Sequence, residues 1–382
     1  MSDVQSCLET ESEAEIKLLL VKSKAVLESA LRITDKPAKS TGSCDEKALD
    51  SFSRSRRAAI LSTACSSKEQ LPSFDDVVGL DAAKAALTEA LVDPRLHPAW
   101  FQRLGVEPWR CILLYGPPGT GKTFLARAAA RQMDATFFNL SSSQLISSWA
   151  GQSEKLIKEL FDVALGAAEE PSASSGVSDV SLVFIDEVDS LCRERSSREE
   201  DSTRRLKTEL LVQTQRLQQQ RETGRKEAFL LCATNCPWEL DGAFVRRFEK
   251  RIFVPLPDAD ARTTLMKRLL GKVHIGGELD WATVGEMTRG YSGDDLRCLA
   301  RETLLMAFRR FKNAAEATPT LALVTQTIRY SADHLCNGPP PPAVANLDKL
   351  DFESALKLVR PTVSEVALEK FEAFTAKYGV NG

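Results

Sequence analysis

The sequence predicts an α/β fold, in which helices cover both faces of a doubly wound parallel sheet, followed by a smaller α-helical lid domain. From residue 74 to residue 256, short apolar runs alternate with helical patterns, the order typical of such a sheet. The stretch Gly116–Thr123 has the spacing of a phosphate-binding loop (P-loop) and stands between an apolar run and a helical pattern. After Pro257 the apolar runs stop and only helical patterns follow, which predicts the second domain.

The individual elements follow from local periodicity. Residues 12–33 repeat apolar side chains at helical spacing, and a second short helix is expected within 47–65. Five apolar runs have the length of buried strands: 111–115, 136–140, 181–185, 228–234 and 251–256. Helices are expected over 81–93, 123–132, 153–165, 203–218, 259–271, 280–290, 293–312, 351–359 and 364–379. Helices between consecutive strands supply the crossovers that parallel pairing requires.

These elements divide the chain into four parts. Residues 1–71 are expected to hold one or two helices and a linker, and residues 72–258 the large α/β domain. Residues 259–345 are expected to form the helical lid with a linker that contains the proline run 338–342, which cannot continue a helix. Residues 346–382 are expected to form C-terminal helices that pack on the large domain.

Composition excludes several classes of protein. The net charge of −3 over 382 residues gives no global attraction to nucleic acid, so no nucleic-acid partner is expected. Nine cysteines and three histidines are too scattered for a zinc site, and they fit reduced thiols. No apolar run is long enough to cross a bilayer, and the acidic N-terminus does not resemble a signal peptide. A cytoplasmic protein is therefore expected.

The P-loop predicts a site for ATP. Glycines allow backbone N–H groups to approach phosphate oxygens, and the following helix presents its N-terminus to them. Lys122 is expected to reach the β- and γ-phosphates, and the Thr123 hydroxyl to bind Mg²⁺. The residues expected to bind the nucleotide here are Gly116, Pro117, Pro118, Gly119, Thr120, Gly121, Lys122, Thr123 and Phe124.

Polar residues at the ends of other strands predict catalysis. Asp186 ends the apolar run 181–185 and would hold Mg²⁺, while Glu187 would polarise the attacking water. Asn235 follows the run 228–234 and would face the γ-phosphate or its water. Arg246 and Arg247 could stabilise a transition state in trans, although pairing with surface carboxylates is the commoner fate of an arginine. These residues indicate a nucleoside triphosphatase.

Taken together, the motifs carry a family resemblance. The chain, with GPPGTGKT, FIDEVDSL, ATNCPWELD, RRFEKRIFVPLP and GYSGDDL, resembles the AAA ATPases of the meiotic clade, which include the vacuolar protein sorting ATPase and katanin. The resemblance implies a hexameric ring with ATP at the subunit interfaces, where Arg246 and Arg247 reach the neighbouring site. It also implies that Asp76 and Val78 lie near the adenine base and Gly293 on its other side.

The same resemblance implies a substrate-pulling pore. Trp149 and Ala150 fall in the segment that lines the pore, whereas Ser148 and Gln152 replace a lysine and a glutamate that the family usually has. The leading interpretation is disassembly of ESCRT filaments on endosomal membranes. The protein is expected to associate with these membranes only through partner proteins. Microtubule severing by pulling on tubulin is the alternative, and a regulatory ring member is a third. Residues 169–179 form an insertion whose role the sequence leaves open.

Overall fold

The computed structural model describes residues 57, 60–61, 64–65, 71–142, 145, 153–166, 179–193, 201–219, 226–271, 280–317 and 347–379. The helix expected over 12–33 and most of the N-terminal region 1–71 lie outside these residues. Among the helices described, none is both long and apolar enough to span a bilayer.

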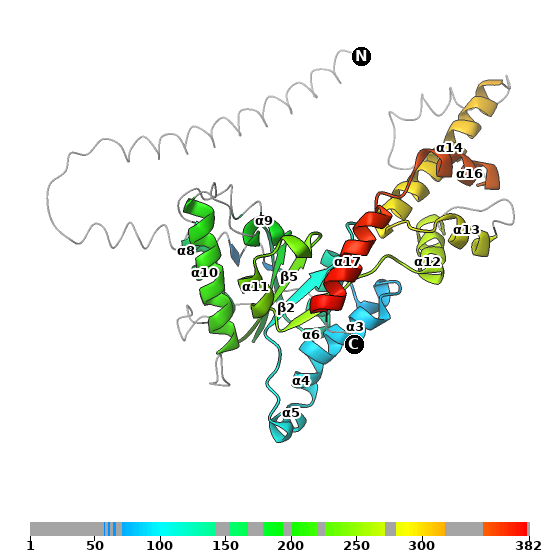
Figure 1. Cartoon of the computed structure of the whole chain (residues 1–382). Helices are drawn as coiled ribbons and strands as arrows, with labels where there is room; N and C mark the ends of the chain where they lie inside the picture. The colour runs from blue at the N-terminus through cyan, green and yellow to red at the C-terminus, as the bar shows by residue number, and fades with distance from the viewer. Residues whose placement is uncertain are drawn as a thin grey trace, which may run out of the picture. The chain divides into compact units, whose positions relative to one another are not determined.

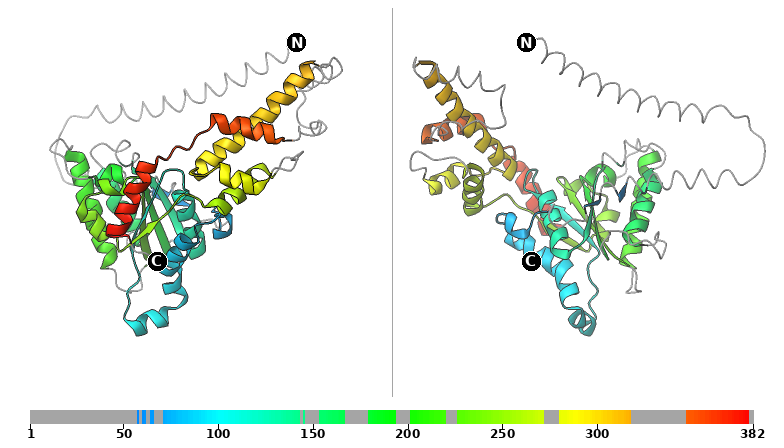
Figure 2. Two further views of the ribbon diagram at one scale, coloured as in Figure 1. Left: turned by 45° about the vertical axis from the view of Figure 1, so that its right-hand side comes forward. Right: turned by 180° about the vertical axis from the view of Figure 1, so that it is seen from behind.

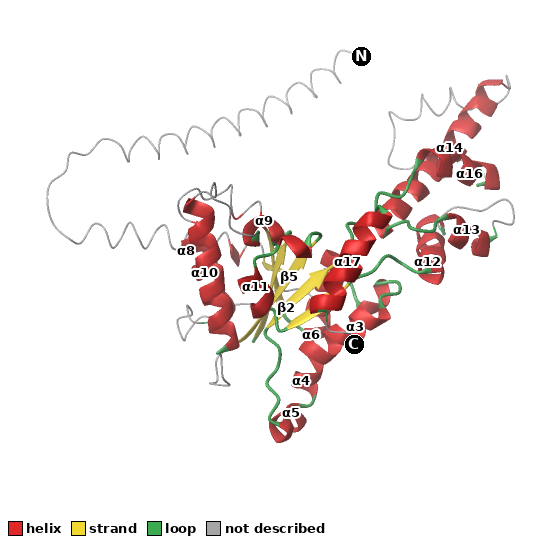
Figure 3. Cartoon of the chain, in the orientation of Figure 1, coloured by secondary structure: helices red, strands yellow, loops and turns green. Residues whose placement is uncertain are grey.

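A single sheet forms the centre of the large domain (Figure 3). Its order is β1-β3-β4-β5-β2-β6, with bounds Ala64–Cys65, Thr136–Ser141, Val180–Asp186, Glu227–Thr234, Cys111–Tyr115 and Lys250–Phe253. The strands β3, β4, β5, β2 and β6 pair in parallel, which confirms the predicted α/β class, and β1 is antiparallel to β3. The prediction of a helix through 47–65 was therefore wrong at its C-terminal end.

Strand β6 ends earlier than the predicted run 251–256 because of Pro255. Val254 still donates its N–H to the carbonyl of Tyr115 at 2.8 Å. Pro255 follows directly and has no N–H with which to continue the ladder. The apolar pattern alone does not show this limit.

Helices cover both faces of the sheet (Figure 1). One face carries α8 (Ser153–Ala164), α9 (Asp189–Cys192), α10 (Asp201–Gln218) and α11 (Gly242–Arg247). The other face carries α3 (Asp81–Leu87) and α6 (Lys122–Met133). The helix expected over 81–93 is interrupted by a π-helical turn, Thr88–Val92, before α4 (Asp93–Leu96), and α5 (Pro98–Leu104) follows without having been predicted.

The lid is a separate hydrophobic cluster formed by α12 (Ala259–Leu270), α13 (Trp281–Met287), α14 (Gly293–Ala317) and α16 (Lys349–Leu358). Phe352 of α16 is buried among the lid helices. By contrast, α17 (Glu365–Tyr378) lies against the sheet (Figure 2), and its Phe371 and Phe374 pack against Tyr115 and Phe253. The C-terminal residues, expected to pack together on the large domain, are thus divided between the two clusters.

Candidate active site

The P-loop joins β2 to α6, and two of its glycines are required by close contacts. A Cβ on Gly116 would lie 2.1 Å from the carbonyl oxygen of Val254. Gly119 has a φ of 73°, and a Cβ there would lie 2.7 Å from the Ser292 hydroxyl of the lid. The loop therefore passes between the neighbouring strand and the lid with no space for side chains at these positions.

Lys122 is the first residue of α6 and is only 7% exposed. Its ammonium donates hydrogen bonds to the carbonyls of Gly116 at 2.8 Å and Pro117 at 2.7 Å. Burial lowers the pKa of Lys122 to about 8, and the nearby carboxylates of Asp186 and Asp189 oppose that shift. The cation lies beside the loop, where it fits the phosphates of a nucleotide.

Thr123 and Asp186 meet at the carboxyl edge of the sheet. The Thr123 hydroxyl, on α6, donates to Oδ2 of Asp186, at the end of β4, at 2.6 Å. Ser142 donates its hydroxyl to the Asp186 carbonyl at 2.7 Å and so fixes the end of the strand. A hydroxyl and a carboxylate are the oxygen donors that Mg²⁺ prefers, so this pair fits the predicted metal-binding residues.

Glu187 follows Asp186 with an unusual backbone conformation. Its φ is 52°, a left-handed value that is uncommon for a residue other than glycine. Its carbonyl accepts hydrogen bonds at 3.0 Å from both the N–H and the hydroxyl of Ser190, which hold the turn, and its side chain is exposed. Strained backbone held in this way concentrates at functional sites. The role of Glu187 as the base stays a prediction.

The residues on either side of Asn235 make two hydrogen bonds that the sequence did not predict. The buried Thr234 hydroxyl donates to Oδ1 of Asp189 at 2.6 Å and accepts the N–H of Cys236 at 3.0 Å. These bonds connect the turn around Asn235 to the segment that follows Glu187. The signal available in the sequence was the threonine directly before Asn235 and the third acidic residue of the run FIDEVD.

The segment predicted to lie near the adenine base connects the large domain to the lid. The carboxylate of Asp76 accepts the N–H and hydroxyl of Ser73 at 2.7 and 2.9 Å, and these bonds hold its pKa below the ordinary value. Arg268 of α12 donates to the Asp76 carbonyl at 2.9 Å. Val78 is half-buried two residues further on. A Cβ on Gly293 would lie 3.1 Å from the carbonyl oxygen of Gly119, so this lid residue lies against the P-loop.

Arg246 and Arg247 lie apart from these residues. They end α11, and the carbonyl of Arg247 accepts a hydrogen bond from the Gln218 side chain at 2.8 Å. Two residues later, Glu249 donates its N–H to the carbonyl of Cys111, the first residue of β2. The arginines are therefore at the amino edge of the sheet, opposite the P-loop. Trp149 and Ala150 lie outside the residues that the structure describes.

Comparisons with known proteins agree with this geometry. The family model for the ATPase family associated with various cellular activities (AAA) matches residues 112–256. The katanin p60 ATPase-containing subunit A1 of Arabidopsis thaliana is 39% identical over 310 residues, 80% of this chain and 54% of that protein. The vacuolar protein sorting-associated protein 4B of Mus musculus is 38% identical over 328 residues, 81% of this chain and 70% of that protein.

The chain belongs to the AAA ATPase family. Membership indicates an ATP-hydrolysing enzyme, and the AAA match contains the P-loop, Asp186 and Asn235. A second family model, the Vps4 C terminal oligomerisation domain, matches residues 343–379, which include α16 and α17. The chain spans about half the length of the katanin relative, 54% of it.

Solved structures show the same AAA fold. A crystal structure of the FIGL-1 AAA domain superposes with a TM-score of 0.68 at 34% identity, covering 85% of this chain and 96% of that one. A structure described as the structural basis for katanin self-assembly has a TM-score of 0.62 at 31% identity, covering 90% of this chain and 99% of that one. The P-loop fold of this AAA ATPase is therefore shared across the group.

Proposed function

We propose that this AAA ATPase assembles head to tail into a ring, most simply a hexamer, and uses ATP hydrolysis to pull a polypeptide through the central pore. The observation that supports this proposal most directly is the position of Arg246 and Arg247. Strand β2 has five residues between its amino end, next to these arginines, and the P-loop. At about 3.3 Å per residue this is roughly 16 Å, more than an arginine side chain spans.

The arginines therefore suit the nucleotide site of another copy. An interface in which one edge of a subunit meets the opposite edge of the next is heterologous, and such interfaces form rings when the rotation from subunit to subunit closes. The match of residues 343–379 to an oligomerisation domain supports assembly, as does the similarity to a katanin structure that concerns self-assembly. An arginine supplied in trans is worth about 10³-fold or more in rate.

Within one site, the residues divide the chemistry among them. Lys122 binds the β- and γ-phosphates, and Thr123 with Asp186 would hold Mg²⁺, which neutralises the phosphate charge when bound. The Glu187 carboxylate accepts a proton from the attacking water, and the Asn235 amide orients that water. The neighbour's Arg246 and Arg247 stabilise the charge of the transition state.

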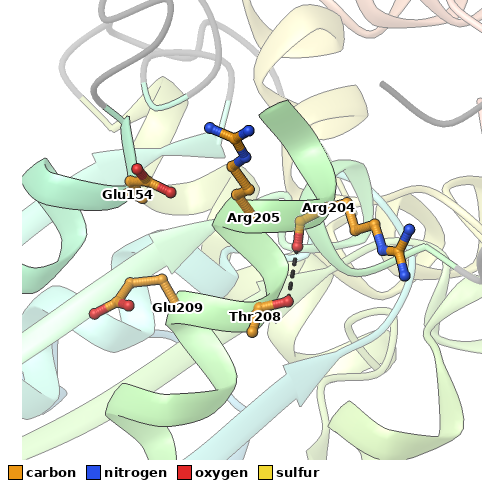
Figure 4. A pocket seen from close by; sticks show the side chains of 5 residues that line it. All are labelled: Glu154, Arg204, Arg205, Thr208 and Glu209. Carbon is orange, nitrogen blue, oxygen red and sulfur yellow. Dashed lines mark hydrogen bonds between the residues drawn. The ribbon is translucent and has the colours of Figure 1, made fainter. Parts of the chain in front are cut away.

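The placement of two helix N-termini supports the pore. Helix α8 begins four residues after Trp149, and α10 begins directly after the arginine-containing segment 193–200. A hollow of about 450 Å³ between these helices is lined by Glu154 from α8 and by Arg204, Arg205, Thr208 and Glu209 from α10 (Figure 4). The pore segment that contains Trp149 and the arginine-containing segment 193–200, which we propose also lines the pore, therefore lead into helices that border the same hollow.

The proposed substrate is an ESCRT filament, with recruitment from the cytoplasm to endosomal membranes through partner proteins. Support comes from the similarity to vacuolar protein sorting-associated protein 4B over 81% of the chain. The second candidate is tubulin in microtubules, because the identity to katanin, 39%, is close to the 38% found for vacuolar protein sorting-associated protein 4B, and because Arg204 and Arg205 are exposed beside the hollow. Acidic tubulin tails would suit these arginines.

A mixing experiment tests the ring. The variant Lys122→Ala loses its own site but keeps its arginines, whereas Arg246→Ala/Arg247→Ala keeps its site but loses the arginines. Each variant alone should be inactive. Randomly mixed rings should recover hydrolysis at about a quarter of the interfaces, where an intact site meets intact arginines. Mixtures as inactive as the separate variants would show that the arginines do not act between subunits.

A disassembly assay tests the substrate. Light scattering should report ATP-dependent loss of ESCRT filaments or of microtubules after addition of the full chain. Trp149→Ala should lose disassembly, whereas Trp149→Tyr, which keeps an aromatic ring, should retain most of it. Glu187→Gln should bind ATP without turnover and accumulate as the assembled ring in gel filtration. Survival of both polymers with the wild-type protein would contradict both substrates.

A further inference from the structure

The connector between α16 and α17 is bonded to the lid at two side chains, the buried carboxylate of Asp295 and the hydroxyl of Tyr291. Oδ2 of Asp295 accepts the N–H of Thr362 at 3.3 Å and its hydroxyl at 3.2 Å. Asp295 is 5% exposed, whereas Thr362 lies on the surface. The Tyr291 hydroxyl adds a third bond by donating to the Val359 carbonyl at 2.6 Å. The start of α14 therefore holds the chain that leads to the last helix.

The same oxygen of Asp295 fixes the lid segment that touches the P-loop. It accepts the N–H and the hydroxyl of Ser292, both at 2.9 Å, and Ser292 accepts the Asp295 N–H in return at 3.2 Å. Between them, the Asp294 N–H donates to the carbonyl of Gly119 at 3.2 Å. Asp295 thus controls the backbone that lies against the phosphate-binding loop.

Helix α17 contacts the large domain on the other side of the site. The hydroxyl of Tyr115, the residue before the P-loop, donates to the Thr375 hydroxyl at 3.0 Å. Phe371 contacts Trp238, three residues after Asn235, with ring centroids 5.0 Å apart. One continuous segment is therefore attached to the lid at Asp295, to the strand that precedes the P-loop, and to the turn that follows Asn235.

We propose that Asp295 is a positioning residue for nucleotide binding. Its carboxylate bonds both Thr362 and Ser292, and we call this connection the latch. Through the latch, α17 and the lid together hold the P-loop in place. The inference rests on one part of the proposed function, namely that the P-loop binds the nucleotide. The simpler explanation is that Asp295 only caps α14, since its bonds with Ser292 form a capping box. The two explanations differ in the role of Thr362, which takes no part in the cap.

The lid supplies a matched control for this difference. Asp351 is also 5% exposed and occupies the same position in the capping box of α16, where its Oδ2 accepts the Asp348 N–H at 3.0 Å. It pairs with Arg310 at 2.8 Å inside the lid. Both of these partners belong to the lid, so Asp351→Asn tests the loss of a buried capping carboxylate without the link to Thr362.

The experiment measures binding of a fluorescent ADP analogue to the full chain. Thr362→Val, at an exposed site, removes the hydroxyl and should weaken binding about 3-fold, whereas Thr362→Ser should restore it. Asp295→Asn should weaken binding about 10-fold, and Asp351→Asn less than about 2-fold. Equal binding by the valine and serine variants of Thr362, or equal losses at Asp295 and Asp351, would overturn the proposal.

Hydrogen exchange without nucleotide provides a second readout. Thr362→Val should speed exchange of the P-loop amides of Gly119, Thr120 and Gly121 relative to Thr362→Ser, because the latch would hold that loop even in the free protein. Unchanged exchange would count against the latch. This readout separates the proposed function from the latch. A wild-type chain that failed to bind ADP would contradict the proposed function, and hydrogen exchange would still test whether Asp295 holds the P-loop.

Discussion

Thr234→Val removes one hydroxyl from beside Asn235 and leaves the shape of the side chain unchanged. The wild-type hydroxyl donates to the Asp189 carboxylate at 2.6 Å and accepts the Cys236 N–H at 3.0 Å, in a residue that is 1% exposed. A hydrogen bond to a charged group contributes about 1.5–3 kcal/mol, and an amide left unpaired costs about 1 kcal/mol or more. The variant should therefore lose about 2.5–4 kcal/mol of unfolding free energy.

The catalytic effect of Thr234→Val should exceed what lost stability explains. The two bonds hold the residues on either side of Asn235, whose amide we propose orients the attacking water. Their loss should let that amide move, and kcat should fall about 10-fold or more at saturating ATP. Phosphate release measures kcat, and urea unfolding measures stability. Thr234→Ser keeps the hydroxyl and should lose only about 1 kcal/mol for the missing methyl group. A valine variant with the kcat of the serine variant would refute the positioning role.

Three further predictions test the P-loop and the C-terminal helix. Gly116→Ala should abolish nucleotide binding and cost about 3 kcal/mol or more in urea unfolding, because its Cβ would meet the Val254 carbonyl at 2.1 Å. Burial lowers the pKa of Lys122 from 10.5 to about 8, so the unfolded chain binds the extra proton between these values and stability should rise across that pH range. Lys122→Met should remove that rise in unfolding experiments. Phe371→Ala, at 1% exposure, should cost about 3–5 kcal/mol, whereas Val366→Ala on the exposed face of the same helix should cost less than about 0.5 kcal/mol.

Much of the fold could be predicted because its signals are local. The strand 111–115 was predicted with the bounds that the structure shows, and the strands at 136–140 and 228–234 within one residue. The errors occurred where local pattern competes with other effects. Pro255 ended β6 early, a π-helical turn divided the helix expected over 81–93, and β1 formed where a helix was expected.

The sequence by itself determined the P-loop, the acidic pair Asp186 and Glu187, and the α/β class, because each depends on residue types a few positions apart. Only the tertiary structure decided which distant groups meet. Asp295 and Thr362 are 67 positions apart, and Tyr115 and Thr375 are 260 apart. Such bonds depend on how α17 and the lid pack, and a pattern read along the chain carries no information about packing across it. Contacts within the large domain, from Gln218 of α10 to Arg247 and from Glu249 to Cys111, placed the two arginines at the edge of the sheet opposite their own P-loop.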